Sequence, residues 1–559
     1  MKSVKLNSHS SLSRREWLSR AAAPALALPL FVSATPFAAD PLLAKLAIYD
    51  IREYGAVGDG IRLNTKEIQA AIDAANAAQG GIVFVPSGTF LCGTIELKSN
   101  VTLRLATNAT LLGSTKREDY SPGNNLPSGN GNIVFISAAN AENITIDGNG
   151  TIDGNGLAFY TGKGDNMGPG GNTAEGYFDR PHLLIFSRCK RLRIQDTYLN
   201  ASAYHCIRIL NCEYVYFYRI RINNRVNRNN DGFHFNNSRY VHVDSCDVRC
   251  QDDACALFGS NKFVTVSNSS FSTRWSIFRF GSGQSENITI TNCTIYETYG
   301  CVIKMGAGRN SRHENMVFSN LIFRDVTGPI SLGLSDPPRE PRPEQENQPS
   351  EPSYVRNIVF SNIRGNVVAH GRQYEDIHYE QGYRPGETRT CITLNGVGES
   401  YLDNITLSNV HLTFEGGGTA EEAQLRDVPQ IAGEYFEIGP RPAHGIYARN
   451  IRGLTIDNVR LETATPDLRP AVVLDNVSDA VLSGLTTQGN PLGPSTIRCI
   501  NTKDTLITAS RLLTPAAVYL AVEGEQSANI ALEGGDIHKS SKTATFERGA
   551  NQKSAIVKI

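Results

Sequence analysis

The sequence predicts an all-β protein, a single-stranded right-handed parallel β-helix with an N-terminal capping helix. A strand–turn–strand unit recurs along the chain, for example as NITIDGNGTI from residue 143, YVHVDSCDV from residue 240 and NITITNCTI from residue 287. Where no insertion intervenes, successive units begin 23 to 28 residues apart, which is typical of one coil of such a helix. A chain of 559 residues also exceeds one compact core, and stacked coils extend a core indefinitely.

The first element of the fold is expected to be a cap at about residues 48–95. Asn64 followed by Glu67 has capping-box character, and Gly80-Gly81 should end the helix. Between them one apolar stripe is formed by Ile68, Ala71, Ile72 and Ala75. We expect this helix to cover the open end of the first coil, because a solenoid exposes strand edges at both ends.

Residues 1–39 differ from the rest and are expected to be a twin-arginine signal peptide. Paired Arg14 and Arg15 are followed by an apolar stretch from Ala21 to Val32. The β-helix domain would then occupy residues 40–559, in a protein that is periplasmic or secreted. No later segment is long and apolar enough to span a bilayer, so no membrane contact is expected after the signal is removed.

Net charge and cysteine content indicate which partners to expect and what role the cysteines have. A net charge of -1 with a pI near 6.8 gives no general attraction to nucleic acid, so no nucleic-acid partner is expected, and we expect a monomer. The eleven cysteines are odd in number and scattered, and we expect most of them to be small buried core residues.

The later coils contain insertions. Three repeat steps between residues 315 and 453 measure 42, 47 and 49 residues, so each contains either an additional weak coil or a long loop. The stretch at residues 336–353 is too rich in proline and charge to form a coil, and we expect a loop that walls a groove, in preference to an interdomain linker.

Three aspartates fall where a β-helix would bring them together. Asp231 and Asp252 are 21 residues apart, with Asp253 adjacent, so we expect them on neighbouring coils, side by side. Three close carboxylates cannot all ionise cheaply, so at least one pKa should be raised while others remain low, which supplies an acid and a base. Glycoside hydrolysis uses such a pair. A role as turn-capping residues is the structural alternative, strongest for Asp231 because Asp-Gly is a common turn pair.

Basic residues continue along the same line. Arg279 and Lys304 occupy the next two coils at similar positions, where they would suit a substrate carboxylate. His205 lies one coil before Asp231 and could line the same site, although an ordinary strand position explains it equally well.

On these residues the chain resembles glycoside hydrolase family 28, the polygalacturonase and rhamnogalacturonase family, as a divergent bacterial member. The resemblance covers nearly the whole mature chain and includes residues 49–114 and 441–462. Centrally, Asn230-Asp231-Gly232 and Gln251-Asp252-Asp253-Ala254 match the family's two aspartate elements.

The resemblance implies roles for these residues. Asp252 would be the general acid, Asp231 and Asp253 would hold and deprotonate the attacking water, and the outcome would be inversion. Lys304 would contact a substrate carboxylate. The family's histidine is replaced in the stretch Arg274-Trp275-Ser276 and its arginine by Val302, and Arg274 or Arg279 could supply the missing positive charge.

The predicted function is a secreted glycosidase acting on a pectin-like, uronic-acid-containing polysaccharide or its oligosaccharides, with no cofactor and no metal. The main alternative is a β-helix polysaccharide lyase or epimerase, in which the clustered acids could bind an oxygen-preferring cation. A noncatalytic glycan-binding β-helix is the third reading, because fold alone does not determine function.

Overall fold

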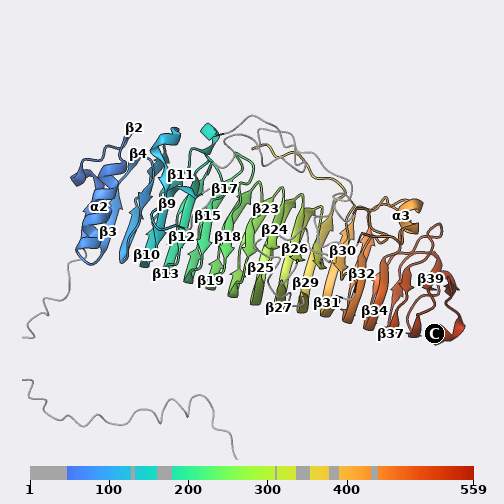
Figure 1. Ribbon diagram of the computed structural model, residues 1–559. Coiled ribbons are helices and arrows are strands. Elements are labelled where there is room, and N and C mark those ends of the chain that lie inside the picture. Colours follow the sequence, from blue (N-terminus) through green and yellow to red (C-terminus); the bar gives the residue numbers. More distant parts are fainter. Residues whose placement is uncertain are drawn as a thin grey trace, which may run out of the picture. The chain divides into compact units, whose positions relative to one another are not determined.

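The computed structural model describes residues 47–126, 132–159, 179–308, 311–334, 353–376, 389–398, 400–429 and 439–558. From Ala47 onward these form one right-handed parallel β-helix, whose strands stack coil upon coil from α2 at one end to β42 at the other (Figure 1). The predicted signal peptide at residues 1–39 lies outside the described residues, as do residues 336–352 of the predicted insertion.

Each coil contributes strands to three parallel sheets. The first sheet contains, in stacking order, β5 (Ile95–Glu96), β9 (Ile133–Ala139), β12 (His182–Ser187), β15 (Ile207–Leu210), β18 (Phe233–Asn236), β21 (Cys255–Phe258), β24 (Ser276–Phe280), β26 (Cys301–Ala307), β28 (Ile330–Leu334), β30 (Ile392–Asn395), β32 (Ile446–Asp457), β34 (Val472–Ser483), β36 (Ile497–Ile500), β39 (Ala516–Glu523) and β41 (Ser540–Glu547). Short β8 (Ser121–Pro122) pairs antiparallel with β9 at the edge of this sheet.

The second sheet contains β1 (Ile48–Asp50), β3 (Gly81–Val85), β6 (Val101–Leu105), β10 (Glu142–Asp147), β13 (Lys190–Gln195), β16 (Glu213–Tyr218), β19 (Arg239–Asp244), β22 (Lys262–Ser267), the first halves of β25 (Gln284–Thr298), β27 (Arg312–Val326), β29 (Tyr354–Val367) and β31 (Leu402–Phe414), the second halves of β32 and β34, then β37 (Lys503–Thr508), β40 (Ala528–Glu533) and β42 (Ala555–Lys558). The third sheet contains β2 (Asp59–Leu63), β4 (Gly88–Cys92), β7 (Ala109–Gly113), β11 (Thr151–Asp153), β14 (Tyr198–Asn200), β17 (Arg221–Asn224), β20 (Asp247–Cys250), β23 (Ser270–Thr273), the second halves of β25, β27, β29 and β31, then β33 (Arg460–Thr463), β35 (Thr486–Thr487) and β38 (Arg511–Leu512).

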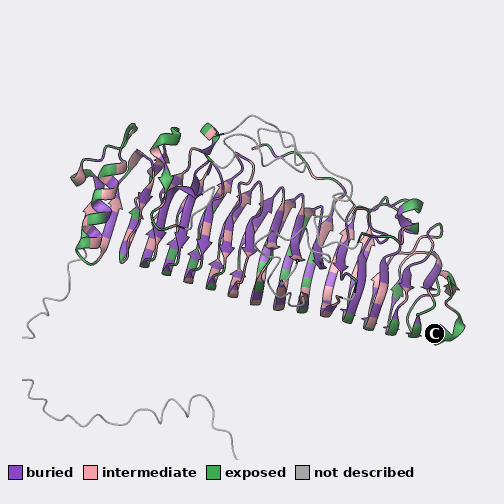
Figure 2. Ribbon diagram, viewed as in Figure 1, coloured by how far each residue is buried: buried purple, intermediate pink, exposed green. Residues whose placement is uncertain are grey.

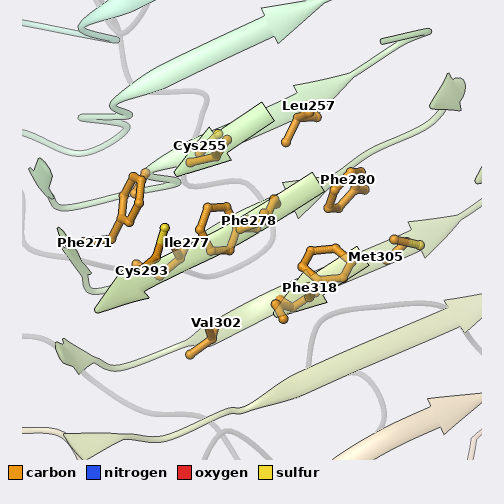
Figure 3. Packing of buried hydrophobic residues seen from close by; sticks show 14 of the residues in the cluster. Cys255, Leu257, Phe271, Ile277, Phe278, Phe280, Cys293, Val302, Met305 and Phe318 are labelled. Atoms are coloured by element: carbon orange, nitrogen blue, oxygen red, sulfur yellow. The ribbon is translucent and has the colours of Figure 1, made fainter. Parts of the chain in front are cut away.

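The interior of the coil holds the apolar core. Side chains alternate along each strand, so in β16 Val215 and Phe217 are buried while Tyr214, Tyr216 and Tyr218 face outward. Equivalent positions stack from coil to coil, and aromatic, aliphatic and sulfur side chains fill the centre, as Figure 3 shows around Phe278 and Met305. Buried residues run along the whole helix in this way (Figure 2). All eleven cysteines are free and buried, which confirms their expected place in the core.

The N-terminal cap is α2 (Thr65–Ala77), which packs on the first coil through the four predicted apolar residues (Figure 1). The predicted capping box is wrong. Asn64 occupies the N-cap position but is fully buried, and its side chain accepts from Val57 N at 2.7 Å and donates to the carbonyls of Val57, Arg62 and Leu91. The amide therefore ties the preceding loop to β4 instead of capping the helix.

The remaining helical elements are short: η1 (Ile51–Tyr54), η2 (Arg117–Asp119), η3 (Gly156–Phe159), α3 (Ala420–Gln424) and η6 (Gln552–Ser554). In the described parts of the chain, no helix has the length and apolar character needed to cross a membrane.

The long repeat steps are loops and not additional coils. Met316 pairs with Ile358, Ile358 with Ile405, and Ile405 with Leu454, so these strands are direct neighbours. The excess residues lie in the connections between strands. Two of these connections, at residues 368–391 and 415–445, lead from the third sheet to the first, as does the earlier one at residues 154–181. The predicted aspartates lie in connections of this same kind.

Candidate active site

The three aspartates lie on two stacked connections between the third and first sheets. Residues 225–232 join β17 to β18, and residues 251–254 join β20 to β21. Gly232 N donates to Asp253 O at 2.9 Å, and Phe233 pairs with Cys255, so Asp231 is in register with Asp253. The adjacency of neighbouring coils is as predicted. The partner in register is Asp253, and Asp252 precedes it by one residue.

The residues flanking Asp231 explain why this connection has one shape. Asn230 is fully buried, and its Oδ1 accepts from the backbone amides of Val226 and Asn227 at 2.9 and 2.6 Å. Its Nδ2 donates to two carbonyls of the preceding coil. At Gly232 a Cβ would lie 2.5 Å from Ala254 O, so a side chain there would force the two coils apart. The Asn-Asp-Gly element therefore fixes the backbone on both sides of the carboxylate.

The carboxylates differ in exposure. Asp231 and Asp253 are 4% and 5% exposed, whereas Asp252 is only partly buried. Asp252 Oδ1 accepts from Asp253 N at 2.8 Å and its Oδ2 accepts from Asn229 Nδ2 at 3.3 Å. Asp252 is thus the carboxylate of the three that solvent and a ligand can reach most readily.

Burial and mutual repulsion raise two of the pKa values. The pKa of Asp231 lies well above its usual range because the group is buried and close to the charge of Asp253, with Arg279 and Arg208 opposing the shift. The pKa of Asp252 is also raised well above its usual range, first by burial and then by the charges of Asp231 and Asp253. Carboxyl groups that hold a proton near neutral pH can act as proton donors.

Arg279 lies beside the carboxylates, and Lys304 stands next to Arg279 on the following coil. They stand opposite each other on β24 and β26, in the register row of His234 and Ala256. Arg279 Nε is 3.5 Å from Asp253 Oδ2, so its side chain reaches back across one coil. Lys304 is 7% exposed, and burial together with the charge of Arg279 lowers its pKa to about 7. The acidic and basic side chains are thus close together because the basic side chains are long, although the backbones lie in different register rows.

Arg274 lies inside the fold. It is 1% exposed and its Nη1 donates to Tyr299 O at 2.6 Å. Its guanidinium carbon is 5.7 Å from the ring centre of Trp275, and Lys304 Nζ is 5.3 Å from the same ring. This burial argues against the predicted contact of Arg274 with substrate and favours a structural role, in which it holds Trp275 and the adjacent turn.

A histidine cluster completes the site, and sequence reasoning identified only one of its members. His205 Nε2 lies 3.7 Å from Asp231 Oδ1, and His234 Nδ1 lies 3.0 Å from Asp231 Oδ2. His182 packs edge-on against His205 at 4.9 Å between ring centres. Burial lowers the pKa of His234 to about 3 and that of His205 well below its usual range, so both rings are neutral at neutral pH. The missed signal is positional: Leu184 pairs with Ile207, so His182 and His205, each two residues earlier, lie in register on consecutive coils.

His205, Asp231 and His234 also place one possible metal-ligand atom each within 4.8 Å of one another. Their geometry does not suit one ion. The two imidazole rings are stacked, with centres 4.8 Å apart and planes at 8°. A metal bound by imidazole lies in the ring plane at about 2.0–2.1 Å from nitrogen, and two parallel, separated planes share no such point. The arrangement therefore fits a hydrogen-bonded carboxylate better than a metal centre.

Residues 77–406, which include every residue of the cluster, match the family described as glycosyl hydrolases family 28. The chain belongs to glycosyl hydrolase family 28. It is by family a glycosidase, and the site described above lies within the matched region.

The chain is similar to individual relatives over different parts of its length. It is 25% identical over 394 residues to polygalacturonase-2 of Solanum lycopersicum, covering 67% of the chain and 77% of that protein. It is 49% identical over 73 residues to an exo-poly-alpha-D-galacturonosidase of Dickeya chrysanthemi, a match that spans 13% of the chain and 12% of that enzyme's own length. A stretch of 66 residues is 41% identical to mannuronan C5-epimerase AlgE1 of Azotobacter vinelandii, and covers 12% of the chain and 5% of that protein.

Among solved structures, the family 28 exopolygalacturonase of Yersinia enterocolitica superposes with a TM-score of 0.57 at 20% identity, covering 78% of each chain. This likeness supports the β-helical fold.

Proposed function

We propose that this family 28 member hydrolyses a glycosidic bond in a pectin-like, uronic-acid-containing polysaccharide or its oligosaccharides, with inversion. The observation that carries the proposal is the meeting of Asp231, Asp252 and Asp253 at one place, with two raised pKa values, beside Arg279 and Lys304. Hydrolysis of a glycoside needs one carboxyl group that carries a proton and one that activates water.

Asp252 takes the role of general acid. It is the most accessible of the three carboxylates, and its raised pKa keeps a proton available for the leaving oxygen. Once that proton has been transferred, the new carboxylate remains held by Asp253 N and Asn229 Nδ2.

Asp231 and Asp253 hold the attacking water and accept its proton. Arg279 Nε is 3.5 Å from Asp253 Oδ2, so its positive charge lies beside that carboxylate. His234 contacts Asp231 Oδ2 at 3.0 Å and fixes the direction of its other oxygen. His234 is thus a positioning residue on the base side of the site.

The substrate class follows from the basic residues and from the relatives. Arg279 and Lys304 stand in adjacent coils next to the acids, where a sugar carboxylate would be neutralised. The relatives named as polygalacturonases and as an exo-poly-alpha-D-galacturonosidase favour a galacturonic-acid polymer. His205 contributes to the wall of the same sugar site. We further propose export by the twin-arginine signal at residues 1–39 and action as a monomer in the periplasm or outside the cell.

Product analysis of the purified mature protein on a panel of pectic fragments tests the proposal. New reducing ends without ultraviolet absorption are expected. An unsaturated product that absorbs in the ultraviolet would indicate a lyase, and a changed sugar without chain cleavage would indicate an epimerase. Binding without any turnover across the panel would indicate a noncatalytic glycan-binding protein. Each of these three results would contradict hydrolysis.

A further inference from the structure

A second surface of the β-helix carries exposed aromatic side chains. Tyr214, Tyr216 and Tyr218 point outward from β16 in the second sheet and are 41%, 37% and 38% exposed. Tyr214 stacks on Tyr240 with ring centres 4.9 Å apart, and Tyr240 stacks on Phe263 at 5.1 Å. This face differs from the face that holds the carboxylates, which lie at the entry to the first sheet.

Tyr214, Tyr240 and Phe263 form an aromatic file along three successive coils. These residues occupy backbone positions that bulky residues avoid. Tyr214, Tyr240 and Phe263 have φ values of 59°, 56° and 57°, in the left-handed region. Asn143 and Asn287 adopt the same conformation at the corresponding turns before and after the file. A non-glycine residue other than Asn or Asp costs about 1–2 kcal/mol there. Such costs are typically retained where the side chain has a function.

The file ends at an open hollow of about 720 Å³. One face of the Tyr214 ring is covered by Tyr240, and the hollow lies on the side of the preceding coil, where Arg191 and Arg193 replace aromatic residues. Its polar and aromatic lining is formed by Asn143, Thr145, Arg191, Arg193, Tyr214 and Tyr216.

The lining is positively charged at one point. Arg191 donates to Asn143 Oδ1 at 2.6 Å and pairs with Glu142, so its charge is already compensated. Arg193 is exposed, lies 6.0 Å from the Tyr216 ring centre, and forms no ion pair with any residue that the structure describes. A guanidinium next to two aromatic rings suits a ligand with both a carboxylate and flat apolar faces.

We propose that this hollow is a second, noncatalytic carbohydrate site that binds a uronic-acid oligosaccharide. A sugar ring stacks on the open face of Tyr214. Tyr216 is stacked on His242 at 5.2 Å and lies beneath Arg193, which binds a uronate carboxylate. The choice of a uronic acid rests partly on the proposed function, while the position of the site does not. Because the two sites occupy different faces, a long polysaccharide can be held here while another segment or another chain enters the catalytic site.

Binding is measured by calorimetry in an Asp252→Asn background, which leaves the sugar intact, with galacturonic-acid oligosaccharides as the probe. Tyr214→Ala/Tyr216→Ala should weaken the binding at this site on the order of tenfold, because it removes the stacking ring of Tyr214 and the ring beneath Arg193. Val317→Ala is the matched control, since Val317 is 38% exposed and lies in the register row of Tyr216, several coils away from the hollow. Tyr214→Asn supplies the residue found at this position in other coils, as at Asn143 and Asn287, so it preserves the backbone while removing the ring.

The site is supported if both tyrosine variants lose binding, if Arg193→Gln removes the preference over neutral glucose oligosaccharides, and if Arg279→Ala/Lys304→Ala retains this binding. Unchanged affinity in folded tyrosine variants would overturn it, and so would equal affinity for neutral sugar. Measurements of turnover distinguish a failure of the proposed function from a failure of the second site. Tyrosine-dependent binding without hydrolysis by the unmutated protein refutes only the proposed function, whereas hydrolysis with tyrosine-independent binding refutes only the second site.

Discussion

Two stretches of this β-helix fill the same left-handed turns with different residues. Between residues 287 and 404 these turns carry Asn287, Asn315, Asn357 and Asn404, with Asn357 Nδ2 donating to Asn315 Oδ1 and Asn404 Nδ2 donating to Asn357 Oδ1, each at 3.1 Å. Between residues 191 and 263 the equivalent turns carry Arg191, Tyr214, Tyr240 and Phe263.

This difference indicates that stability and function are supplied by different stretches of the β-helix. The asparagine residues adopt this backbone conformation readily, and they add hydrogen bonds between neighbouring coils. The other stretch accepts bulky residues in a conformation that disfavours them, and it also carries Asp231, Asp252 and Asp253 and their repulsion. The functional coils therefore contain groups that cost stability, and the regular coils beyond them contribute it.

The largest expected effect comes from Asp252→Asn. Turnover of galacturonic-acid oligosaccharides should fall by about 10²–10⁴, the usual contribution of a general acid. The Tm at neutral pH should rise, because a folded-state pKa raised above the unfolded value of 3.8 means that the ionised form costs stability. This gain should disappear below pH 3.8, where both states are protonated.

Asp479→Asn is the control for that variant, since Asp479 lies exposed at a left-handed turn of the regular coils. It should alter neither turnover nor Tm. If Asp252→Asn retained turnover, or lowered Tm at neutral pH, the conclusion that the functional coils contain catalytic groups that lower stability would be wrong.

The next largest effect is expected in the regular stretch, from Asn357→Ala. This variant removes one hydrogen bond donated to Asn315 and one accepted from Asn404, and it places Ala in the left-handed region. The free energy of unfolding in urea should fall by about 2–3 kcal/mol, with kcat unchanged. Asn357→Gly keeps the conformation and should lose only the hydrogen bonds. A loss of activity without loss of stability would contradict the separation of roles.

A smaller effect should follow from His234→Gln. The ring contacts Asp231 at 3.0 Å, so its loss should lower kcat about tenfold, with KM nearly unchanged, because positioning acts mainly on the reacting geometry. The pH–rate profile should also shift on its acidic limb, since His234 is part of the environment of Asp231. A residue that served only packing would lower Tm and leave this profile in place.

The smallest effect concerns Lys304 and pH. Its pKa of about 7 means that the ammonium is charged below pH 7 and neutral above it. The kcat/KM for uronate substrates should therefore fall as pH rises through about 7. Lys304→Arg stays charged and should flatten this limb. An unmutated profile that is flat across pH 6–8 would show that Lys304 does not bind the substrate carboxylate.

The sequence predicts the β-helix because its period is a property of chain distance alone. NITIDGNGTI becomes β10 and β11, and NITITNCTI lies in the single strand β25, whose two halves pair with β22 and β23. It places the aspartates on neighbouring coils for the same reason. It does not fix register to one residue, because the contact between Gly232 and Asp253 sets the alignment and a count of 21 residues does not reveal it.

The spacing of residues along the chain does not predict the direction in which a side chain points. Arg274 was expected near substrate and instead turns inward to Tyr299 O. Asn64 was expected to cap a helix and instead ties a loop to β4. His234 was overlooked because its link to Asp231 depends on a rotamer and on a turn of three residues. These features are determined by contacts between residues that are distant in sequence.

The most direct test of the central claim is proton NMR of the first product released from a galacturonic-acid oligosaccharide by the mature protein. An acid and a base on opposite sides of the bond predict a saturated product whose new reducing end first appears with the opposite anomeric configuration from the cleaved linkage. A reducing end of retained configuration would contradict this division of roles among Asp231, Asp252 and Asp253. A vinyl proton from an unsaturated product would contradict hydrolysis itself.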